Sequence, residues 1–308
     1  MSNNSDFAVK KDSSWHLLVV LWLVIIGMIL TTNVNHALLP STTTKYTTHY
    51  LHSSTTPTLQ IPEPNYQDEL ELLLIDTIKD MDGDIAIYIE DLSSNKITSI
   101  NSHPMHSASL IKLFVAGAYY EEVKNELVIE NDLSKAQLDA MISYSNNDAW
   151  TWLESFIAYG SIYDGALKVT AFAKEHNYKD TGRLVSPSSF ESVGEDNFTS
   201  VEDVGRVLRE IYNEEYINKD ASISILTAMK NQALTSKIPS GLPEGIKFAN
   251  KTGELDSVQN DAAIIYADNI DYILVVMMDE VYNGVEAVEN ISKISELTYE
   301  YMSKINHH

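Results

Sequence analysis

The chain has 308 residues, of which 44% are hydrophobic and 21% are charged, a composition typical of folded globular proteins. Its formal net charge of −23 argues against a nucleic-acid partner, because such proteins gain affinity from Lys and Arg that neutralise phosphates. The chain has no cysteine, which excludes disulfides, thiol nucleophiles and thiolate metal sites.

Residues 15–32 (WHLLVVLWLVIIGMILTT) form an apolar run of 18 residues without formal charge. As a helix this run would span roughly 27 Å, close to the thickness of a bilayer core. Lys10 and Lys11 precede it, so the positive-inside rule places residues 1–14 in the cytoplasm and everything after residue 32 outside. A cleavable signal peptide is the alternative, but the following residues offer no good small-x-small cleavage site. We therefore expect a single-pass anchor in the cell membrane.

Residues 33–66 are dominated by Ser, Thr and Pro and have no apolar periodicity, which predicts a tether. A folded domain is expected over residues 67–308. It opens with a predicted helix over residues 68–83, closed by Gly83, and a strand that places Ile85, Ile87 and Ile89 on one face. A turn then leads into a second strand over residues 96–100.

The middle of the domain is predicted to be helical, with apolar residues at three- and four-residue spacing. The expected helices cover residues 109–127, 134–145, 147–160 and 164–177. Trp150, Trp152 and Phe156 fall at helical spacing, which is typical of core packing. Residues 181–198 read as irregular, and Ser200 then begins a helix with Glu202 and Asp203 in its first turn.

The C-terminal part returns to strands, expected over residues 246–254, 261–268 and 271–280, before a final helix over residues 283–305. Strands at both ends with helices between them predict an α+β fold. In this fold the two ends of the domain build one antiparallel sheet flanked by helices, and a helical lobe is inserted between the halves of the sheet. A cleft is expected where the lobe meets the sheet.

Ser109 and Lys112 lie at the start of the first predicted lobe helix, so their spacing places hydroxyl and amine on one face, a turn apart. A serine hydroxyl becomes a good nucleophile when a neighbouring base takes its proton, and a partly buried lysine can be that base. Alone the pattern is weak, because Ser93-Ser94-Asn95-Lys96 also matches Ser-x-x-Lys in a predicted turn.

Two further motifs follow in order along the chain. Ser145-Asn146-Asn147 lies between two predicted helices, where such residues also commonly serve as helix caps. Lys251-Thr252-Gly253 lies in a predicted C-terminal strand, where the glycine indicates close approach by a ligand or another backbone, or a bulge. The three motifs together, in this order, are far more specific than any one of them.

This conjunction resembles the class A β-lactamases and the penicillin-binding D,D-peptidases, over a stretch from about Asp84 to Glu280. The segments GEDNFTS and NKTGELDSVQNDAAIIY resemble a related branch of serine hydrolases. The resemblance implies a β-lactamase/transpeptidase-like fold. It also implies that Ser109 forms an acyl-enzyme, that Lys112 accepts its proton, and that Ser145 relays a proton toward the leaving nitrogen.

The same resemblance implies the substrate contacts. Asn147 would bind the side-chain amide of the substrate, while Lys251 and Thr252 would bind its carboxylate. The oxyanion would lie between the backbone N–H groups of Ser109 and Glu254, which follows Gly253.

Two features depart from the class A pattern. The interval from Ser109 to Ser145 is shorter, which predicts a reduced lobe and a more open cleft. The Arg-x-Glu-x-x-Leu-Asn segment, whose Glu activates the deacylating water, is replaced by Arg183-Leu184-Val185-Ser186-Pro187. Glu191 and Glu195 have the wrong spacing and are interpreted as solvated loop residues. Deacylation is therefore expected to be slow.

We therefore expect a serine hydrolase that acylates with β-lactams or with D-Ala-D-Ala-type amides of peptidoglycan peptides. A cell-wall D,D-carboxypeptidase or transpeptidase is the alternative within the enzyme class, and a binding ectodomain without turnover is the alternative outside it. No phosphate-binding loop or zinc motif is present, so neither a cofactor nor a metal is expected.

Overall fold

The computed structural model describes residues 66–186 and 189–304, and it describes side chains for 68–184 and 196–304. The main sheet has five antiparallel strands in the order β2-β1-β8-β7-β6. Its strands are β1 (Asp84–Asp91), β2 (Lys96–Ile100), β6 (Lys247–Leu255), β7 (Val258–Tyr266) and β8 (Asp271–Asp279). The two ends of the domain therefore build one sheet, which confirms the predicted α+β architecture.

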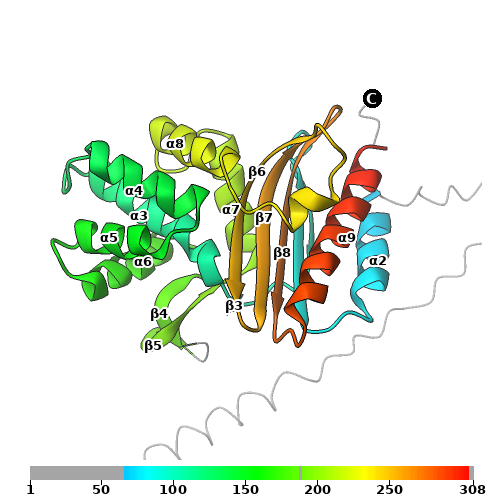
Figure 1. Cartoon of the computed structure of the whole chain (residues 1–308), viewed down its shortest axis with the longest axis horizontal. Helices are drawn as coiled ribbons and strands as arrows, with labels where there is room; N and C mark the ends of the chain where they lie inside the picture. The colour runs from blue at the N-terminus through cyan, green and yellow to red at the C-terminus, as the bar shows by residue number, and fades with distance from the viewer. Residues whose placement is uncertain (1–65, 187–188, 305–308) are drawn as a thin grey trace, which may run out of the picture. The chain divides into compact units, whose positions relative to one another are not determined.

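Two helical layers cover the sheet. On one face lie α2 (Tyr66–Ile78) and α9 (Gly284–Met302), while α7 (Val201–Tyr212) packs on the other (Figure 1). Beyond α7 lies the lobe, made of α3 (Ile111–Lys124), α4 (Asp132–Ser143), α5 (Asn147–Ile157), α6 (Ile162–Glu175) and α8 (Lys219–Lys230). The four predicted lobe helices are present, whereas α8 was not predicted.

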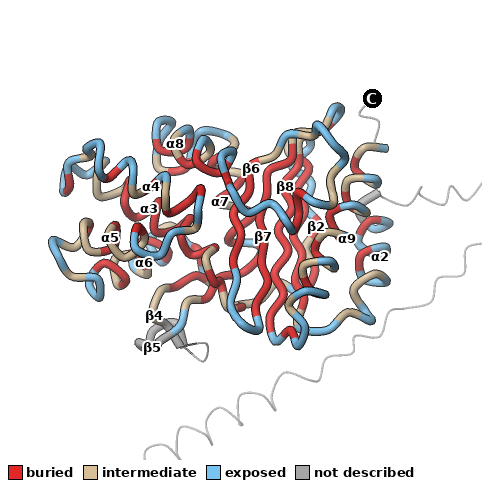
Figure 2. The backbone as a smooth tube through the Cα atoms, viewed as in Figure 1, coloured by how far each residue is buried: buried red, intermediate tan, exposed pale blue. Residues whose placement is uncertain are grey.

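The strands are buried on both faces because each face has its own core (Figure 2). Ile85, Ile87 and Ile89 belong to the core beneath α2 and α9, as the alternation predicted. Ala86 and Tyr88, which alternate with them, belong to the core beneath α7 and the lobe. This two-sided burial fixes the register, because a slip of one residue would exchange the two faces.

The first helix ends earlier than predicted. It stops at Ile78, five residues before Gly83, and Gly83 instead begins the approach to β1 with a φ of 95°. A Cβ atom at this position would lie 2.7 Å from the carbonyl oxygen of Asp279. The glycine is therefore required by close packing against the end of β8, and not as a helix cap.

The expectation of irregular structure over residues 181–198 was wrong. This stretch contains β4 (Gly182–Ser186) and β5 (Ser189–Thr199), which form a second sheet with β3 (Met105–His106) in the order β3-β5-β4. The register of β4 against β5 shifts between Arg183 and Val185, and Leu184 has a φ of 54°. These irregularities interrupt the period-two alternation by which strands are predicted from sequence.

The predicted membrane anchor at residues 15–32 and tether at residues 33–66 lie outside the described residues, apart from Tyr66, the first residue of α2. Within the part of the chain that the structure describes, no helix is both long enough and apolar enough to cross a bilayer.

Candidate active site

Ser109 lies in a short 3-10 helix, η1 (Ala108–Leu110), that leads directly into α3. The preceding residue, Ala108, has a φ of 45°, a conformation that non-glycine residues rarely adopt. Leu110 and Ile111 are buried in the core between the sheet and the lobe, and they fix this strained turn. Such strain is typical of functional sites, and here it falls one residue before the predicted nucleophile.

The side chain of Lys112 is fully buried. Its Nζ donates to the carbonyl oxygen of Ser145 at 2.6 Å, to Asn147 Oδ1 at 2.7 Å and to Ser145 Oγ at 3.3 Å. Burial lowers the pKa of Lys112 to about 8, because the charged form loses its hydration. An appreciable fraction of this amine is therefore neutral near physiological pH.

Ser145 lies at the junction between α4 and α5, with a φ of 53°. Its hydroxyl oxygen accepts a second hydrogen bond, from Lys251 Nζ of β6 at 2.9 Å. Lys251 also donates to the Thr252 carbonyl oxygen at 2.7 Å. Burial holds the pKa of Lys251 well below its ordinary value, and the nearby charge of Lys112 lowers it further. One serine hydroxyl thus connects two buried amines from the lobe and the sheet.

Gly253 brings the edge of the sheet against the turn that carries Ser109. A Cβ atom at Gly253 would lie 2.9 Å from the carbonyl oxygen of Ser107 and 3.2 Å from the backbone nitrogen of Ser109. Only a glycine allows this approach. Because β6 is an edge strand, part of its backbone faces away from the sheet and has no strand partner there.

The structure therefore brings Lys112, Ser145, Asn147 and Lys251 together through hydrogen bonds. Ser109 lies next to this group, because its backbone nitrogen is close to Gly253 of the strand that carries Lys251. Among the described residues, none forms a hydrogen bond with the Ser109 hydroxyl, and Lys112 directs its amine to Ser145 and Asn147 instead.

The remaining predicted residues lie on β6. Thr252 is buried, whereas the side chain of Glu254 is exposed to solvent. Asn147 stands at the first position of α5, where its amide oxygen is engaged by Lys112.

Two buried side chains that were not predicted support this strand and turn. Lys237 Nζ donates to the carbonyl oxygens of Gly253 at 2.9 Å and Asn260 at 3.1 Å. Asn260 Nδ2 in turn donates to the carbonyl oxygens of His106 at 2.9 Å and Ser107 at 3.2 Å. Lys237 stands in a loop without a motif, so only the fold reveals its role. Asn260 lies within the segment already noted for its resemblance to serine hydrolases.

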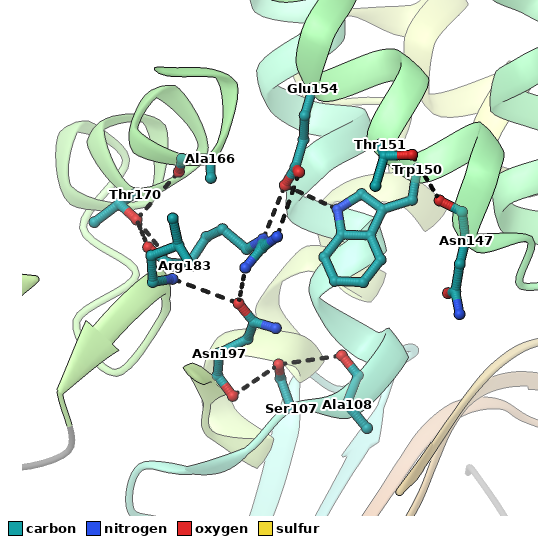
Figure 3. Close-up of polar contacts among 11 residues, drawn as sticks. Ser107, Ala108, Asn147, Trp150, Thr151, Glu154, Ala166, Thr170, Arg183 and Asn197 are labelled. Carbon is teal, nitrogen blue, oxygen red and sulfur yellow. Dashed lines mark hydrogen bonds and ion pairs between the residues drawn. The ribbon is translucent and has the colours of Figure 1, made fainter. Parts of the chain in front are cut away.

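A second polar network joins the lobe to the β4–β5 hairpin (Figure 3). Arg183 Nε donates to Glu154 Oε1 at 2.9 Å, and Trp150 Nε1 donates to the same oxygen at 2.8 Å. Arg183 Nη1 also donates to Asn197 Oδ1 at 3.0 Å, and the Asn197 carbonyl accepts from Ser107 Oγ at 3.1 Å. The network thus runs from α5 through both hairpin strands to within two residues of Ser109.

Trp150 belongs both to this network and to the residues that pack against the core. Its ring lies 4.6 Å from the Arg183 guanidinium and 5.2 Å from Lys112 Nζ. Trp152 and Phe156 stack on each other at 4.9 Å and pack against the lobe core, as predicted. All three aromatic residues therefore pack against the core, as their helical spacing predicted, and Trp150 also borders the candidate site.

No carboxylate among the described side chains forms a hydrogen bond with Ser109. Glu191 and Glu195 lie in β5, and their side chains fall outside the described part of the chain. Within the described residues there is also no group of three His, Asp or Glu residues arranged to hold a metal ion.

The sequence profile of the Beta-lactamase enzyme family matches residues 131–302, and the chain belongs to this family. Solved structures share the fold. PBP-A covers 79% of this chain and 97% of its own, with a TM-score of 0.65 and 20% identity. The β-lactamase of Sphaerobacter thermophilus covers 78% and 99%, with a TM-score of 0.63 and 15% identity. The TLA-3 extended-spectrum β-lactamase covers 77% and 100%, with a TM-score of 0.64 and 18% identity.

These structures support the α+β β-lactamase-like fold predicted from the motifs. A sequence comparison with curated proteins gives no match.

Proposed function

We propose that the chain is a serine acyl-transfer enzyme that forms an acyl-enzyme on Ser109 with β-lactams or with D-Ala-D-Ala-type amides. The observation that carries this proposal is the pair of buried amines, Lys112 and Lys251, on the hydroxyl of Ser145. Burying two amines beside one another costs free energy that a purely structural contact would not require. Such perturbed groups are typical of sites where protons are transferred.

Acylation begins when Ser109 Oγ bonds to the carbonyl carbon of the substrate and its proton passes to neutral Lys112. The C–N bond then breaks, and the leaving nitrogen takes a proton from Ser145 Oγ. Ser145 recovers a proton from the Lys112 ammonium, which lies 3.3 Å from its oxygen. The net result is that the Ser109 proton moves to the leaving nitrogen and both Lys112 and Ser145 return to their starting states.

The remaining groups have electrostatic roles in this proposal. The Ser109 amide, next to Gly253, and the Glu254 amide would stabilise the oxyanion of the tetrahedral intermediate. The Lys251 amine would donate a hydrogen bond to the carboxylate that β-lactams and D-Ala-D-Ala peptides share. The amide nitrogen of Asn147 would donate to the substrate's side-chain carbonyl.

The deacylation step is proposed to be slow. Hydrolysis requires a water molecule that is held and deprotonated at the ester, and the class A glutamate is absent from the Arg183-Leu184-Val185 segment. A variant of PBP-A, which has a similar fold, has been captured as an acyl-enzyme complex with penicillin G. A D,D-peptidase that transfers its acyl group to a specific amine would need no such general base for water.

The localisation proposed for the enzyme is the outer face of the cell membrane. The apolar run at residues 15–32 supports an anchor, and Lys10 and Lys11 support a cytoplasmic N-terminus. The domain from residue 67 would then meet cell-wall peptides directly.

Labelling with a fluorescent penicillin tests this function. The full chain, purified in detergent, should acquire a covalent label that survives denaturation. Ser109→Ala should remove the label while the thermal unfolding midpoint stays unchanged. A label that persists on Ser109→Ala would place the nucleophile elsewhere, and the absence of labelling by both β-lactams and D-Ala-D-Ala peptides would refute the proposed chemistry.

A further inference from the structure

The buried amine of Lys237 lies behind the strand that supplies one of the two proposed oxyanion donors. Lys237 stands directly before the short 3-10 helix η2 (Ile238–Gly241) and is 2% exposed. Its Nζ donates to the carbonyl oxygen of Gly253 at 2.9 Å and to that of Asn260 at 3.1 Å. The Gly253 carbonyl belongs to the same peptide group as the amide N–H of Glu254. Lys237 therefore contacts the opposite end of the peptide group that carries the proposed donor.

The hydrogen bonds of Lys237 show which way this peptide group points. Gly253 and Asn260 are cross-strand partners in β6 and β7, and one amine reaches the carbonyl oxygens of both, so the Gly253 carbonyl points toward β7. In a trans peptide group the C=O and N–H bonds point in opposite directions, so the Glu254 N–H points away from β7, to the free edge of the sheet. The backbone nitrogen of Ser109 lies close by, 3.2 Å from the position that a Cβ atom at Gly253 would take.

Two carboxylates favour the charged form of Lys237. Asp261 is fully buried, and its carboxylate accepts hydrogen bonds from the Ile238 amide at 3.0 Å and from Asn250 Nδ2 at 3.1 Å. Burial raises the pKa of Asp261 to about 6, so this group is still ionised at neutral pH. Glu254 Oε2 lies 4.0 Å from Lys237 Nζ. Burial lowers the pKa of Lys237, and the negative charges of Asp261 and Glu254 oppose this effect.

Packing of the strand does not require a charge at this position. Burying an amine costs free energy, and an uncharged side chain of similar length would fill the same space at a lower cost. Direct contact with a substrate does not explain the charge either, because Lys237 is almost fully buried and its amine donates to two backbone carbonyls. The charge can therefore act on the reaction through the peptide group that it contacts.

We propose that Lys237 is a positioning residue that polarises the Gly253–Glu254 peptide group and so strengthens the Glu254 amide as an oxyanion donor. A positive charge at the carbonyl oxygen draws electron density from the nitrogen, so the N–H proton becomes more positive. This N–H then stabilises the oxyanion of the tetrahedral intermediate more than the neutral carbonyl of the bound substrate. The inference rests on the proposed function, because it explains how the oxyanion of that reaction is stabilised.

Three variants of Lys237 separate its charge from its hydrogen bonds. Lys237→Gln keeps a donor group but removes the charge, Lys237→Met removes both, and Lys237→Arg keeps both. With the full chain in detergent, stopped-flow measurements over a range of penicillin concentrations give the dissociation constant of the noncovalent complex and the acylation rate constant separately. The Gln and Met variants should lower the rate constant about tenfold, because a unit charge one peptide group away acts strongly in a site shielded from water. The dissociation constant should not change, and Lys237→Arg should acylate at nearly the original rate.

Infrared spectra of the acyl-enzyme report the strength of the oxyanion donors directly. The stretching frequency of the ester carbonyl falls as the donors polarise its C=O bond, and an isotope label in the lactam carbonyl of the penicillin identifies this band. Lys237→Gln should raise the frequency, whereas Lys237→Arg should not. The matched control Lys247→Gln makes the same charge change at an exposed position of the same strand and should alter neither the acylation rate nor the frequency.

Chemical rescue keeps the test decisive if the larger guanidinium of Lys237→Arg prevents folding. The chain has no cysteine, so Lys237→Cys introduces a single thiol that can be alkylated in denaturant before the chain is refolded in detergent. Bromoethylamine restores a lysine-like ammonium, and iodoacetamide adds an uncharged amide instead. The ammonium adduct should regain the acylation rate of the unmodified chain and the amide adduct should not, whereas equal rates for the two adducts would overturn the inference.

The outcomes distinguish this inference from the proposed function. If Lys237 only holds the strand through hydrogen bonds, Lys237→Gln and Lys237→Arg should behave alike, because both side chains can donate to backbone carbonyls. Equal acylation rates and equal carbonyl frequencies in these two variants would therefore overturn the inference and leave the proposed function standing. Absence of acylation in the unmodified chain would refute the proposed function, and this inference with it.

Discussion

Lys112 and Lys251 donate to the same oxygen, Ser145 Oγ, at 3.3 and 2.9 Å. Two ammonium groups this close repel each other in a site shielded from water, which favours loss of one proton. The arrangement joins residues 139 positions apart and places two buried amines, both with a lowered pKa, on one hydroxyl group.

The first prediction concerns pH. If neutral Lys112 is the base, the second-order rate of penicillin acylation should rise with pH and level off above an apparent pKa of about 8. The rate rises because deprotonation converts the ammonium into the active base. Stopped-flow labelling between pH 6 and 9.5 measures this profile, and Lys112→Ala should lack the inflection. An inflection near pH 5 would instead indicate a carboxylate base.

The same burial affects stability. The pKa of Lys112 falls from 10.5 in the unfolded chain to about 8 in the folded domain, so between these values the unfolded state binds more protons. The free-energy cost of burying the charged Lys112 is present in full below pH 8, and it decreases as the pH rises toward 10.5. The Lys112→Met variant should therefore be more stable than the unmodified domain at pH 7, and this advantage should shrink by pH 10. Chemical denaturation at both pH values measures the difference, and an advantage independent of pH would contradict the assignment.

The second prediction concerns Gly253. Gly253→Ala should lower the acylation rate by about 10²–10³, because the added methyl group forces the edge strand away from the Ser109 amide. Gly245→Ala is the control, since Gly245 has a φ of 92° but no atom within 4 Å of the position that an added methyl group would take. The control should lose stability but acylate normally. Equal rate losses in both variants would mean that general destabilisation, and not the oxyanion geometry, explains the effect.

The third prediction concerns the ion pair between Arg183 and Glu154, whose side chains are 13% and 0% exposed. Glu154→Gln should destabilise the domain by about 3–5 kcal/mol, because it leaves the guanidinium charge buried without its partner. The exposed pair Lys219–Glu214 provides the comparison, where Glu214→Gln should have a much smaller effect. Urea unfolding measures both. A small effect at Glu154 would show that the β4–β5 hairpin does not depend on this contact.

The fourth prediction concerns deacylation. After brief exposure to a penicillin, the protein should keep the added mass far longer than a class A β-lactamase would, since a positioned general base is typically worth about 10²–10⁴ in rate. Val185→Glu places a carboxylate at the motif's glutamate position and should shorten the adduct's lifetime, whereas Val185→Gln should not. Rapid return of the unmodified chain to its original mass, with hydrolysed drug accumulating, would contradict the prediction and point to Glu191 or Glu195 as the base.

The fifth prediction concerns the membrane. The full chain should remain with membranes after a high-salt wash, because burial of an apolar helix does not depend on charge. Deletion of residues 1–32 should release it into the soluble fraction. Recovery of the intact chain as a soluble protein would contradict the predicted membrane anchor.

The helices and strands with a regular spacing of apolar residues could be predicted from the sequence. The alternation of Ile85, Ile87 and Ile89 predicted a strand face, and Ser200 marked the start of α7, where its hydroxyl accepts from the Asp203 amide. The hairpin β4–β5 was missed because its bulges disrupt alternation. The pattern Ser93-x-x-Lys96 was rightly set aside, since Ser93 and Ser94 donate to Asp91 in the turn between β1 and β2.

The residues of the candidate site could also be predicted only in part. Ordered motifs predicted Lys112, Ser145, Asn147 and Lys251, which the fold brings into contact, because each motif is a local pattern. Lys237 could not be predicted, because its role depends on a buried contact with Gly253 that only the tertiary structure creates.

The pairing of β1 with β8 has a consequence for biosynthesis. Asp84 pairs with Asp279, roughly 200 positions later, so the centre of the sheet cannot close until almost the whole chain has left the ribosome. Until then β1 and β2 expose apolar side chains on both faces and a free backbone edge. Premature termination anywhere before β8 should therefore leave a nascent β1–β2 hairpin prone to aggregation, while α3, α4, α5 and α6, which contact one another over short sequence separations, can already form.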